Sequence, residues 1–193
     1  MAKGSQKGSG FERSICKTLS LWWTKNKRDD IFWRTSGSGG RATVRMKHQA
    51  TTADSAGDIM AISEGGKIFT RNFLVELKRG YSKQISVLSF IDSLDKLKKK
   101  PILFDWWMKA EKERLQHKRK WSIIIFKKDR KQICVFLSQE VFNFFVKLKQ
   151  KRQIKHLLIT IDKKHKFVIF PLNSFLKIVK IDKFKLAIQE GAK

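Results

Sequence analysis

Acidic residues are scarce in this chain. Its 193 residues include 17 Asp and Glu but 43 Lys and Arg, which gives a formal net charge of +26. A lysine-rich composition would explain some of the basic residues, but it would not explain the shortage of acids. Basic surfaces bind nucleic acids because neutralising phosphates releases condensed counterions. We therefore expect an anionic polymer as the partner, rather than a membrane surface, for which no long amphipathic basic helix stands out.

Cysteines and long hydrophobic runs are also few. The two cysteines, Cys16 and Cys134, lie within apolar patterns, and we expect buried, reduced thiols rather than a disulfide or a nucleophile. No histidine pairs with them at the spacing of a zinc site. No apolar run reaches the roughly 18–20 residues that a membrane span needs. Residues 1–10 are rich in Gly, Ser and Lys with no hydrophobic stretch after them, so we expect a mobile basic tail, no signal peptide and a cytoplasmic location.

The apolar periodicity predicts alternating helices and strands. The expected helices span 11–23, 86–97, 102–116 and 138–148, with a short one from 175, and the expected strands span 31–34, 58–62, 69–78, 121–126, 133–137, 157–161 and 167–170. Ser9 is a plausible N-cap of the first helix, with Glu12 as its capping-box partner. We expect strands 58–62 and 69–78 to form an antiparallel hairpin around the Gly-containing turn at 64–67.

The order of strand, basic turn, strand and helix occurs twice, over 122–145 and 158–179. This weak internal similarity has two interpretations. It indicates either one mixed sheet extended by a second hairpin or a coincidence between common supersecondary units.

The strongest chemical signal is a spaced set of carboxylates ending in a lysine. Asp58 follows Gly57 at the edge of one apolar run, and Glu76 and Lys78 alternate with Val75 and Leu77 in another. Alternate side chains of a strand share a face, so Glu76 and Lys78 point the same way. Together with Asp58 they can hold a divalent cation and orient a water, and in so basic a chain the target of that water is a phosphodiester. Taken singly, Asp58 is equally well a turn residue, and Glu76 with Lys78 a solvated strand face.

These residues resemble those of the PD-(D/E)XK nuclease superfamily, most closely its archaeal Holliday-junction-resolvase branch. The matching segments are Lys7-Gly8, Gly10-Phe11-Glu12-Arg13, Arg34 with Ser36-Gly37, Gly57-Asp58-Ile59 with Ala61-Ile62, and Val75-Glu76-Leu77-Lys78. Gly57 stands where proline is common in such families. The lysine-rich hairpins and the C-terminal segments around Phe170 and Phe175 look more like those of phage-type members of the superfamily.

The resemblance implies an α/β fold with a restriction-endonuclease-like core, in which helices flank a mixed central sheet and a C-terminal strand and helix extension follows. We accordingly expect a flexible basic tail at 1–10, a nuclease core at 11–137 and a basic extension at 138–193 packed on the core. The implied activity is a metal-dependent endodeoxyribonuclease, selective for branched DNA as the resolvases are. The implied assembly is a homodimer, in the host cytoplasm if the chain is phage-encoded.

The resemblance also assigns roles to individual residues. Asp58, Glu76 and the carbonyl oxygen of Leu77 would bind Mg²⁺, or Mn²⁺, which neutralises charge and supplies hydroxide near pH 7. Lys78 would orient or deprotonate the attacking water, or stabilise developing charge. Glu12 would bind a second metal or hold a metal-bound water. Phosphate contacts are expected from Arg13, Arg34, Ser36, Arg41 and Lys83.

Three other functions remain open at this point. One is a restriction- or nicking-type nuclease acting on duplex or single-stranded DNA. Another is a nucleic-acid-binding protein without catalysis, in which the basic turns at 127–131 and 163–166 carry the function. The third is a degenerate nuclease fold kept as a binding scaffold.

Overall fold

A mixed sheet forms the centre of the molecule. The computed structural model describes residues 3–35, 56–81, 100–147 and 155–190, together with residues 85, 86, 88, 91 and 92. Within these ranges, five strands pair in the order β3-β4-β5-β7-β6. Their bounds are Phe73–Arg79 for β3, Trp121–Lys127 for β4, Ile133–Ser138 for β5, Leu157–Thr160 for β6 and Lys166–Pro171 for β7. β3 and β4 run parallel and the other neighbours antiparallel.

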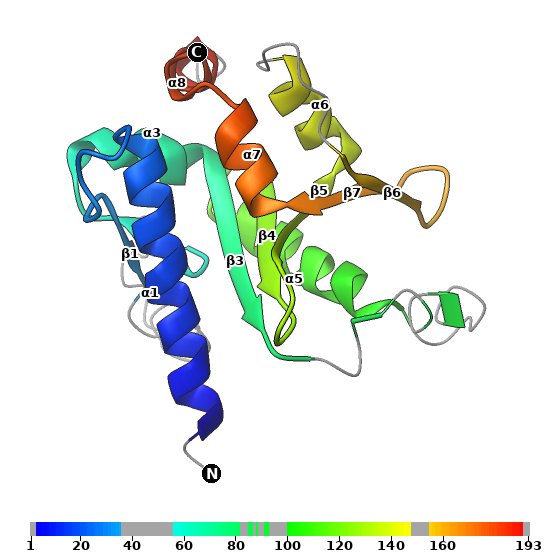
Figure 1. The fold of residues 1–193 in the computed structure, drawn as a ribbon. Coiled ribbons are helices and arrows are strands. Elements are labelled where there is room, and N and C mark those ends of the chain that lie inside the picture. The colour runs from blue at the N-terminus through cyan, green and yellow to red at the C-terminus, as the bar shows by residue number, and fades with distance from the viewer. Residues whose placement is uncertain are drawn as a thin grey trace.

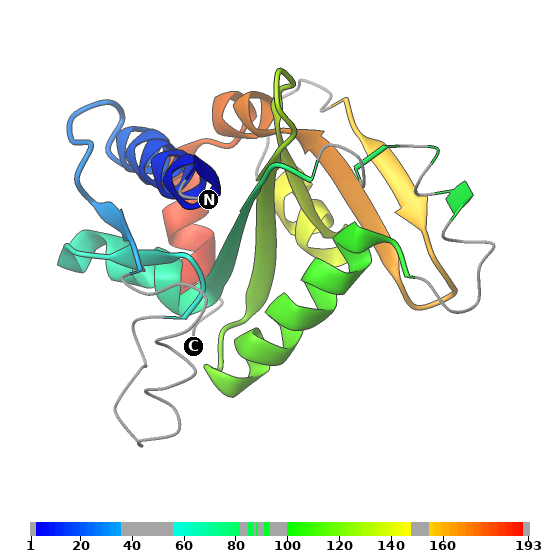
Figure 2. The same ribbon diagram turned by 90° about the horizontal axis from the view of Figure 1, so that it is seen from below.

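Helices cover both faces of this sheet. They are α1 (Lys3–Trp23), α3 (Glu64–Asn72), α5 (Ile102–Gln116), α6 (Gln139–Lys147), α7 (Leu172–Ile178) and α8 (Ile181–Glu190). α5 packs on one face, while α1, α3, α6, α7 and α8 contribute to the hydrophobic cluster on the other. Figure 2 shows α1 and α5 on opposite sides of β3 and β4. The predicted α/β class, with a mixed sheet flanked by helices, is confirmed. None of the described helices is both long and apolar enough to cross a membrane.

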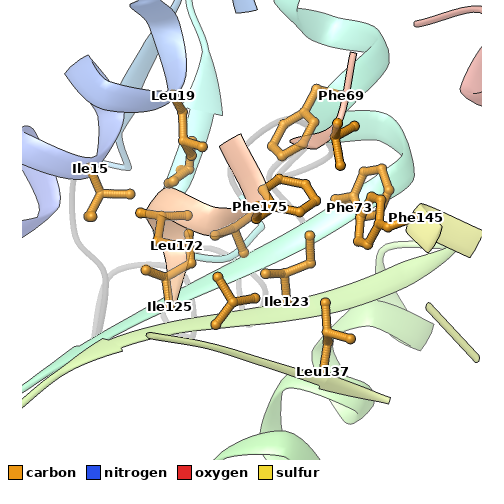
Figure 3. Close-up of a cluster of buried hydrophobic side chains, with 14 of the residues drawn as sticks. Ile15, Leu19, Phe69, Phe73, Ile123, Ile125, Leu137, Phe145, Leu172 and Phe175 are labelled. Atoms are coloured by element: carbon orange, nitrogen blue, oxygen red, sulfur yellow. The ribbon is translucent and has the colours of Figure 1, made fainter. Parts of the chain in front are cut away.

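Strand alternation explains which side chains of β3 point to each face of the sheet. Phe73, Val75 and Leu77 of β3 lie in the larger cluster, beneath the helices. Leu74 lies on the opposite face with Ala110 of α5, and Glu76 and Lys78 follow it there by the same period of two. Figure 3 shows part of the larger cluster, with labelled side chains from the sheet and from α1, α3, α6 and α7. A cavity of about 10 Å³ remains among them, near the lower limit for one water, so this face is closely packed.

Most of the predicted elements of the second half are confirmed. The predicted helix 102–116 is α5, and the predicted strands at 121–126, 133–137, 157–161 and 167–170 are β4, β5, β6 and β7. The Oγ of Ser138 accepts the Val141 N–H at 3.4 Å, so this serine caps α6 as expected. β5 pairs with β7, so the repeated unit extends a single mixed sheet. Residues 157–190 thus share that sheet and its hydrophobic core. The predicted helix 86–97 lies mostly outside the described residues.

The predicted hairpin between 58–62 and 69–78 is wrong. α3 separates these segments, and β2 (Ile59–Ala61) pairs antiparallel with β1 (Phe32–Arg34) in a small separate sheet. The expected turn glycine, Gly66, serves close packing instead. A Cβ at this position would lie 2.7 Å from Ile31 Cγ2 and 3.2 Å from Ala61 Cβ. The glycine therefore lets the helix approach the β1–β2 pair.

The predicted start of the first helix at residue 11 is also wrong. α1 begins at Lys3 rather than at residue 11, so Ser9 lies inside the helix instead of capping it. A Cβ at Gly8 or Gly10 would meet nothing within 4 Å, and Figure 1 shows the first turns of α1 projecting beyond the sheet. Helix propagation accounts for this, because each added residue gains one hydrogen bond once the packed part of the helix has formed.

Candidate active site

A glycine turn places Asp58 beside β3. Gly57 has φ +71°, and a Cβ there would lie 2.7 Å from the carbonyl oxygen of Val75, so both the conformation and the space require glycine. The next N–H, that of Asp58, donates to the same Val75 carbonyl at 2.9 Å. Asp58 is therefore attached to the central sheet although β2, which follows it, belongs to the small sheet.

Two further side chains hold this turn. Thr35 Oγ1 donates to the Gly57 carbonyl at 2.8 Å, and the Thr35 N–H donates to the Asp58 carbonyl at 3.1 Å. From the other side, Glu113 Oε1 of α5 accepts the Gly57 N–H at 2.8 Å. Sequence reasoning missed both residues. Thr35 directly follows the predicted strand 31–34, and Glu113 is one of several charges on a predicted helix, so neither carried a distinguishing signal.

Asp58, Glu76 and Lys78 converge at this turn. Asp58 is only 6% exposed, and its Oδ2 accepts the Leu77 N–H at 2.7 Å. Lys78 Nζ donates to Glu76 Oε2 at 2.5 Å and lies 4.0 Å from Asp58 Oδ2. The predicted common face of Glu76 and Lys78 is thus present, and the ammonium lies between two carboxylates.

Burial and like charge perturb this cluster. Burial raises the pKa of Glu76 to about 7, and the negative charge of Asp58 adds to the rise. For Lys78, burial lowers the pKa, but the charges of Glu76 and Asp58 outweigh it and hold the pKa above its usual value. Lys78 is therefore an ammonium at neutral pH, while Glu76 titrates near neutrality.

Glu12 reaches the same cluster from α1. Its Oε2 lies 3.1 Å from Arg34 Nε of β1. Burial raises the pKa of Glu12, and the charge of Asp58 raises it further, which places the two carboxylates within electrostatic range. One turn further along α1, burial raises the pKa of the Cys16 thiol to about 12. Cys16 is thus the buried, unreactive thiol that the sequence predicts.

The structure therefore brings together most of the predicted site residues that it describes. These are Glu12, Arg34, Asp58, Glu76, Leu77 and Lys78. Arg13 is exposed on α1, next to Glu12. Ser36, Arg41 and Lys83 lie outside the described residues.

The donor atoms fit a hard divalent cation. Among the residues that the structure describes, no group of three Asp, Glu, His or Cys side chains is arranged to hold a metal ion. The set implied by the resemblance needs fewer side chains: the carboxylates of Asp58 and Glu76 with the carbonyl oxygen of Leu77. Oxygen donors of this kind suit Mg²⁺ and Mn²⁺. Burial raises the pKa of Glu76 most, and repulsion from Asp58 raises it further; a cation would relieve that repulsion.

A buried acid beside a strand that carries an acid and a lysine two residues apart, with a further acid from the preceding helix, defines a PD-(D/E)XK site on a mixed sheet. Comparison with known families matches residues 3–186 to the family described as phage putative PDDEXK endonuclease. The match covers most of the chain, and the chain belongs to this family. The predicted superfamily and the phage-type resemblance are confirmed. No curated protein and no solved structure matches the chain.

Proposed function

We propose that this protein is a metal-dependent endonuclease that hydrolyses DNA phosphodiesters. The observation that carries the proposal is the convergence of Asp58, Glu76 and Lys78 at one turn. Membership of a PDDEXK endonuclease family supports the nuclease class. The net charge of +26 supports a polyanionic substrate.

In this proposal, Asp58, Glu76 and the Leu77 carbonyl hold Mg²⁺, with Mn²⁺ as a substitute. When bound, such an ion lowers the pKa of its water and neutralises charge on the phosphate. Lys78, kept as an ammonium by its two acidic neighbours, donates hydrogen bonds and stabilises negative charge that develops on the phosphate oxygens. Its raised pKa favours this role over that of a general base.

Glu12 and the arginines near it complete the proposed machinery. Glu12 is half-buried beside Asp58 and is paired with Arg34, so it is placed to hold a metal-bound water or a second ion. Arg13 is exposed on the same helix and would contact a backbone phosphate. Arg34 would orient Glu12 and contribute positive charge near the scissile phosphate.

For the substrate we propose branched DNA cut by a homodimer, on the resemblance to archaeal Holliday-junction resolvases. The experiment compares wild type and Glu76→Ala with Mg²⁺ on a four-way junction, a linear duplex of the same sequence and single-stranded DNA. Paired symmetric nicks in the junction alone, lost in the variant, would support the resolvase activity. Cutting of linear or single-stranded DNA would retain the nuclease and replace the junction by a restriction- or nicking-type substrate. Tight binding without cutting would mean that the fold is a binding scaffold.

A further inference from the structure

A second polar site lies across α5 from the carboxylate cluster. Glu113 of α5 binds Gly57, whereas Glu111, two residues earlier, accepts a hydrogen bond from Ser122 Oγ of β4 at 2.6 Å. Residues two apart on a helix do not share a face, so the two glutamates of α5 belong to two different sites. The second site is an open groove of about 570 Å³ between α5, the start of α6 and the turn that precedes β7.

The charge of this groove is positive. Its acid, Glu111, is neutralised by Arg114 at 2.8 Å and also accepts a hydrogen bond from the hydroxyl of Ser122. Lys120, Lys164 and Lys166 line the groove and are exposed. Glu140, which is also exposed, is the other acidic residue among the described lining residues. Three lysines and a neutralised acid make a site for an anion with more than one charged group.

An aromatic ring lines the groove beside these lysines. Trp107 is half-buried, with its ring packed edge-on against Phe167 at 4.9 Å and against His165 at 5.7 Å between centroids. These contacts fix the ring on its inner side, and its remaining surface lines the groove. A rigid aromatic surface next to cations is the arrangement by which proteins hold unpaired bases, because the ring stacks on the base while the cations bind its phosphates.

We propose that this groove binds an unpaired segment of DNA, with a base against Trp107 and the flanking phosphates on Lys120, Lys164 and Lys166. The volume suits one or two nucleotides, since ligand sites of about 300–1,000 Å³ hold groups of this size. A duplex keeps its bases stacked inside and cannot offer one to Trp107. The proposal rests on the proposed function and deepens it, because it adds unpaired nucleotides to the features of the DNA that the protein recognises.

The test measures binding of a single-stranded oligonucleotide of about 10 nucleotides in EDTA, where no metal-dependent cleavage occurs. The variant Lys164→Gln/Lys166→Gln is compared with Lys180→Gln/Lys183→Gln. The control pair is also exposed but lies at α8, on the other side of the sheet. Both variants have the same net charge, so a difference between them reports the location of the lysines and not the total charge.

The groove variant is expected to bind about tenfold more weakly, and the slope of log K against log salt should fall by about 1.4, or 0.7 for each lost phosphate contact. The control variant should keep the wild-type slope. Binding should also quench tryptophan fluorescence in wild type but not in Trp107→Phe. Equal binding by the two lysine variants, or quenching that persists in Trp107→Phe, would overturn the proposal that the groove binds an unpaired segment with a base on Trp107.

Failure of the proposed function gives a different pattern of results. If the wild type binds the oligonucleotide through the groove but cleaves no DNA in Mg²⁺, the groove stands and the nuclease fails. If the wild type cleaves DNA while the groove variant binds single strands as well as the control does, the nuclease activity is supported and the groove is not the binding site for single strands. Tighter binding of a blunt duplex than of the single strand, lost in the groove variant, would show a phosphate-binding site for duplex DNA and overturn the stacked base.

Discussion

Glu113 of α5 accepts the backbone N–H of Gly57 at 2.8 Å, across 56 residues of sequence. This contact ties the turn that presents Asp58 to a helix on the same face of the sheet as Glu76. The charge of Glu113 is also one of the influences that raise the pKa of Glu76, after burial and Asp58. A residue outside the predicted catalytic set thus both positions the turn and affects the electrostatics of the site.

Replacing Glu113 should separate these two effects. Glu113→Gln keeps an acceptor oxygen but removes the charge, so we expect cleavage within about threefold of wild type and a pH–rate profile shifted to lower pH. Glu113→Ala leaves the Gly57 N–H without its acceptor, so unfolding free energy should fall by about 1–3 kcal/mol and cleavage should fall further than in the Gln variant. Urea unfolding and initial cleavage rates measure both. Identical rates in the two variants would mean that the hydrogen bond does not position the site.

Gly57 should not tolerate a side chain. Gly57→Ala introduces a Cβ 2.7 Å from the Val75 carbonyl oxygen at a positive φ, and we expect a loss of about 2 kcal/mol or more. Gly65→Ala is the matched control, because it lies in α3 and its Cβ would meet nothing within 4 Å. That substitution should raise stability by up to about 1 kcal/mol, the helix-propensity difference. Equal effects of the two substitutions in urea unfolding would contradict the turn geometry.

The sequence predicts Glu76 and Lys78 well because their relation is local. Strand alternation places them on one face whatever strand lies beside them. The proximity of Asp58 depends instead on a tertiary contact, the hydrogen bond from its N–H to Val75. We expected Asp58 beside Glu76 from a hairpin between their two strands, which the structure does not contain, and from the resemblance to a known family.

The error at α3 has a physical reason. Gly65 and Gly66 are typical of a turn, and the apolar run that follows is typical of a strand. The packing of Gly66 against Ile31 and Ala61 overrides these local preferences. Such a close approach is visible only once β1 and β2 have been placed, and the same holds for the hydrogen bond between Glu113 and Gly57.

The pKa of Glu76 predicts how stability depends on pH in the absence of metal. Its pKa of about 7 in the folded protein exceeds the ordinary value of 4.5, so between these pH values the folded state binds more protons than the unfolded state. Stability should therefore fall as pH rises from about 4.5 to about 7, by up to about 3 kcal/mol, and then level off. Glu76→Gln should flatten this part of the curve. Urea unfolding in EDTA across this range checks the expectation, and a rise in stability over it would contradict the raised pKa.

Addition of a divalent cation should reverse this trend. A cation binds the ionised carboxylate, so Mg²⁺ or Mn²⁺ should raise the melting temperature more at pH 8 than at pH 5.5. Asp58→Ala should abolish the increase at both pH values if Asp58 is a ligand. Arg28 and Asp30 form an exposed ion pair in the segment between α1 and β1. Asp30→Ala therefore removes one carboxylate outside the cluster and should leave the increase intact. A cation effect that is unchanged by Asp58→Ala would place the binding elsewhere.

Replacing Lys78 should lower the rate of DNA cleavage without weakening cation binding, whereas replacing a metal ligand should weaken both. Lys78→Ala removes the ammonium that lies between Glu76 and Asp58. Because that ammonium lowers the pKa of Glu76, cation binding by the variant is measured at a pH high enough to ionise both carboxylates. Cation affinity should then hold or increase, because the cation no longer competes with the ammonium for Glu76. Cleavage should nevertheless fall on the order of 100-fold, the usual cost of losing one donor to a developing oxyanion. Isothermal titration with Mn²⁺ and initial cleavage rates give the two values, and a variant that lost cation binding along with cleavage would show that Lys78 maintains the ligand geometry instead of acting on the phosphate.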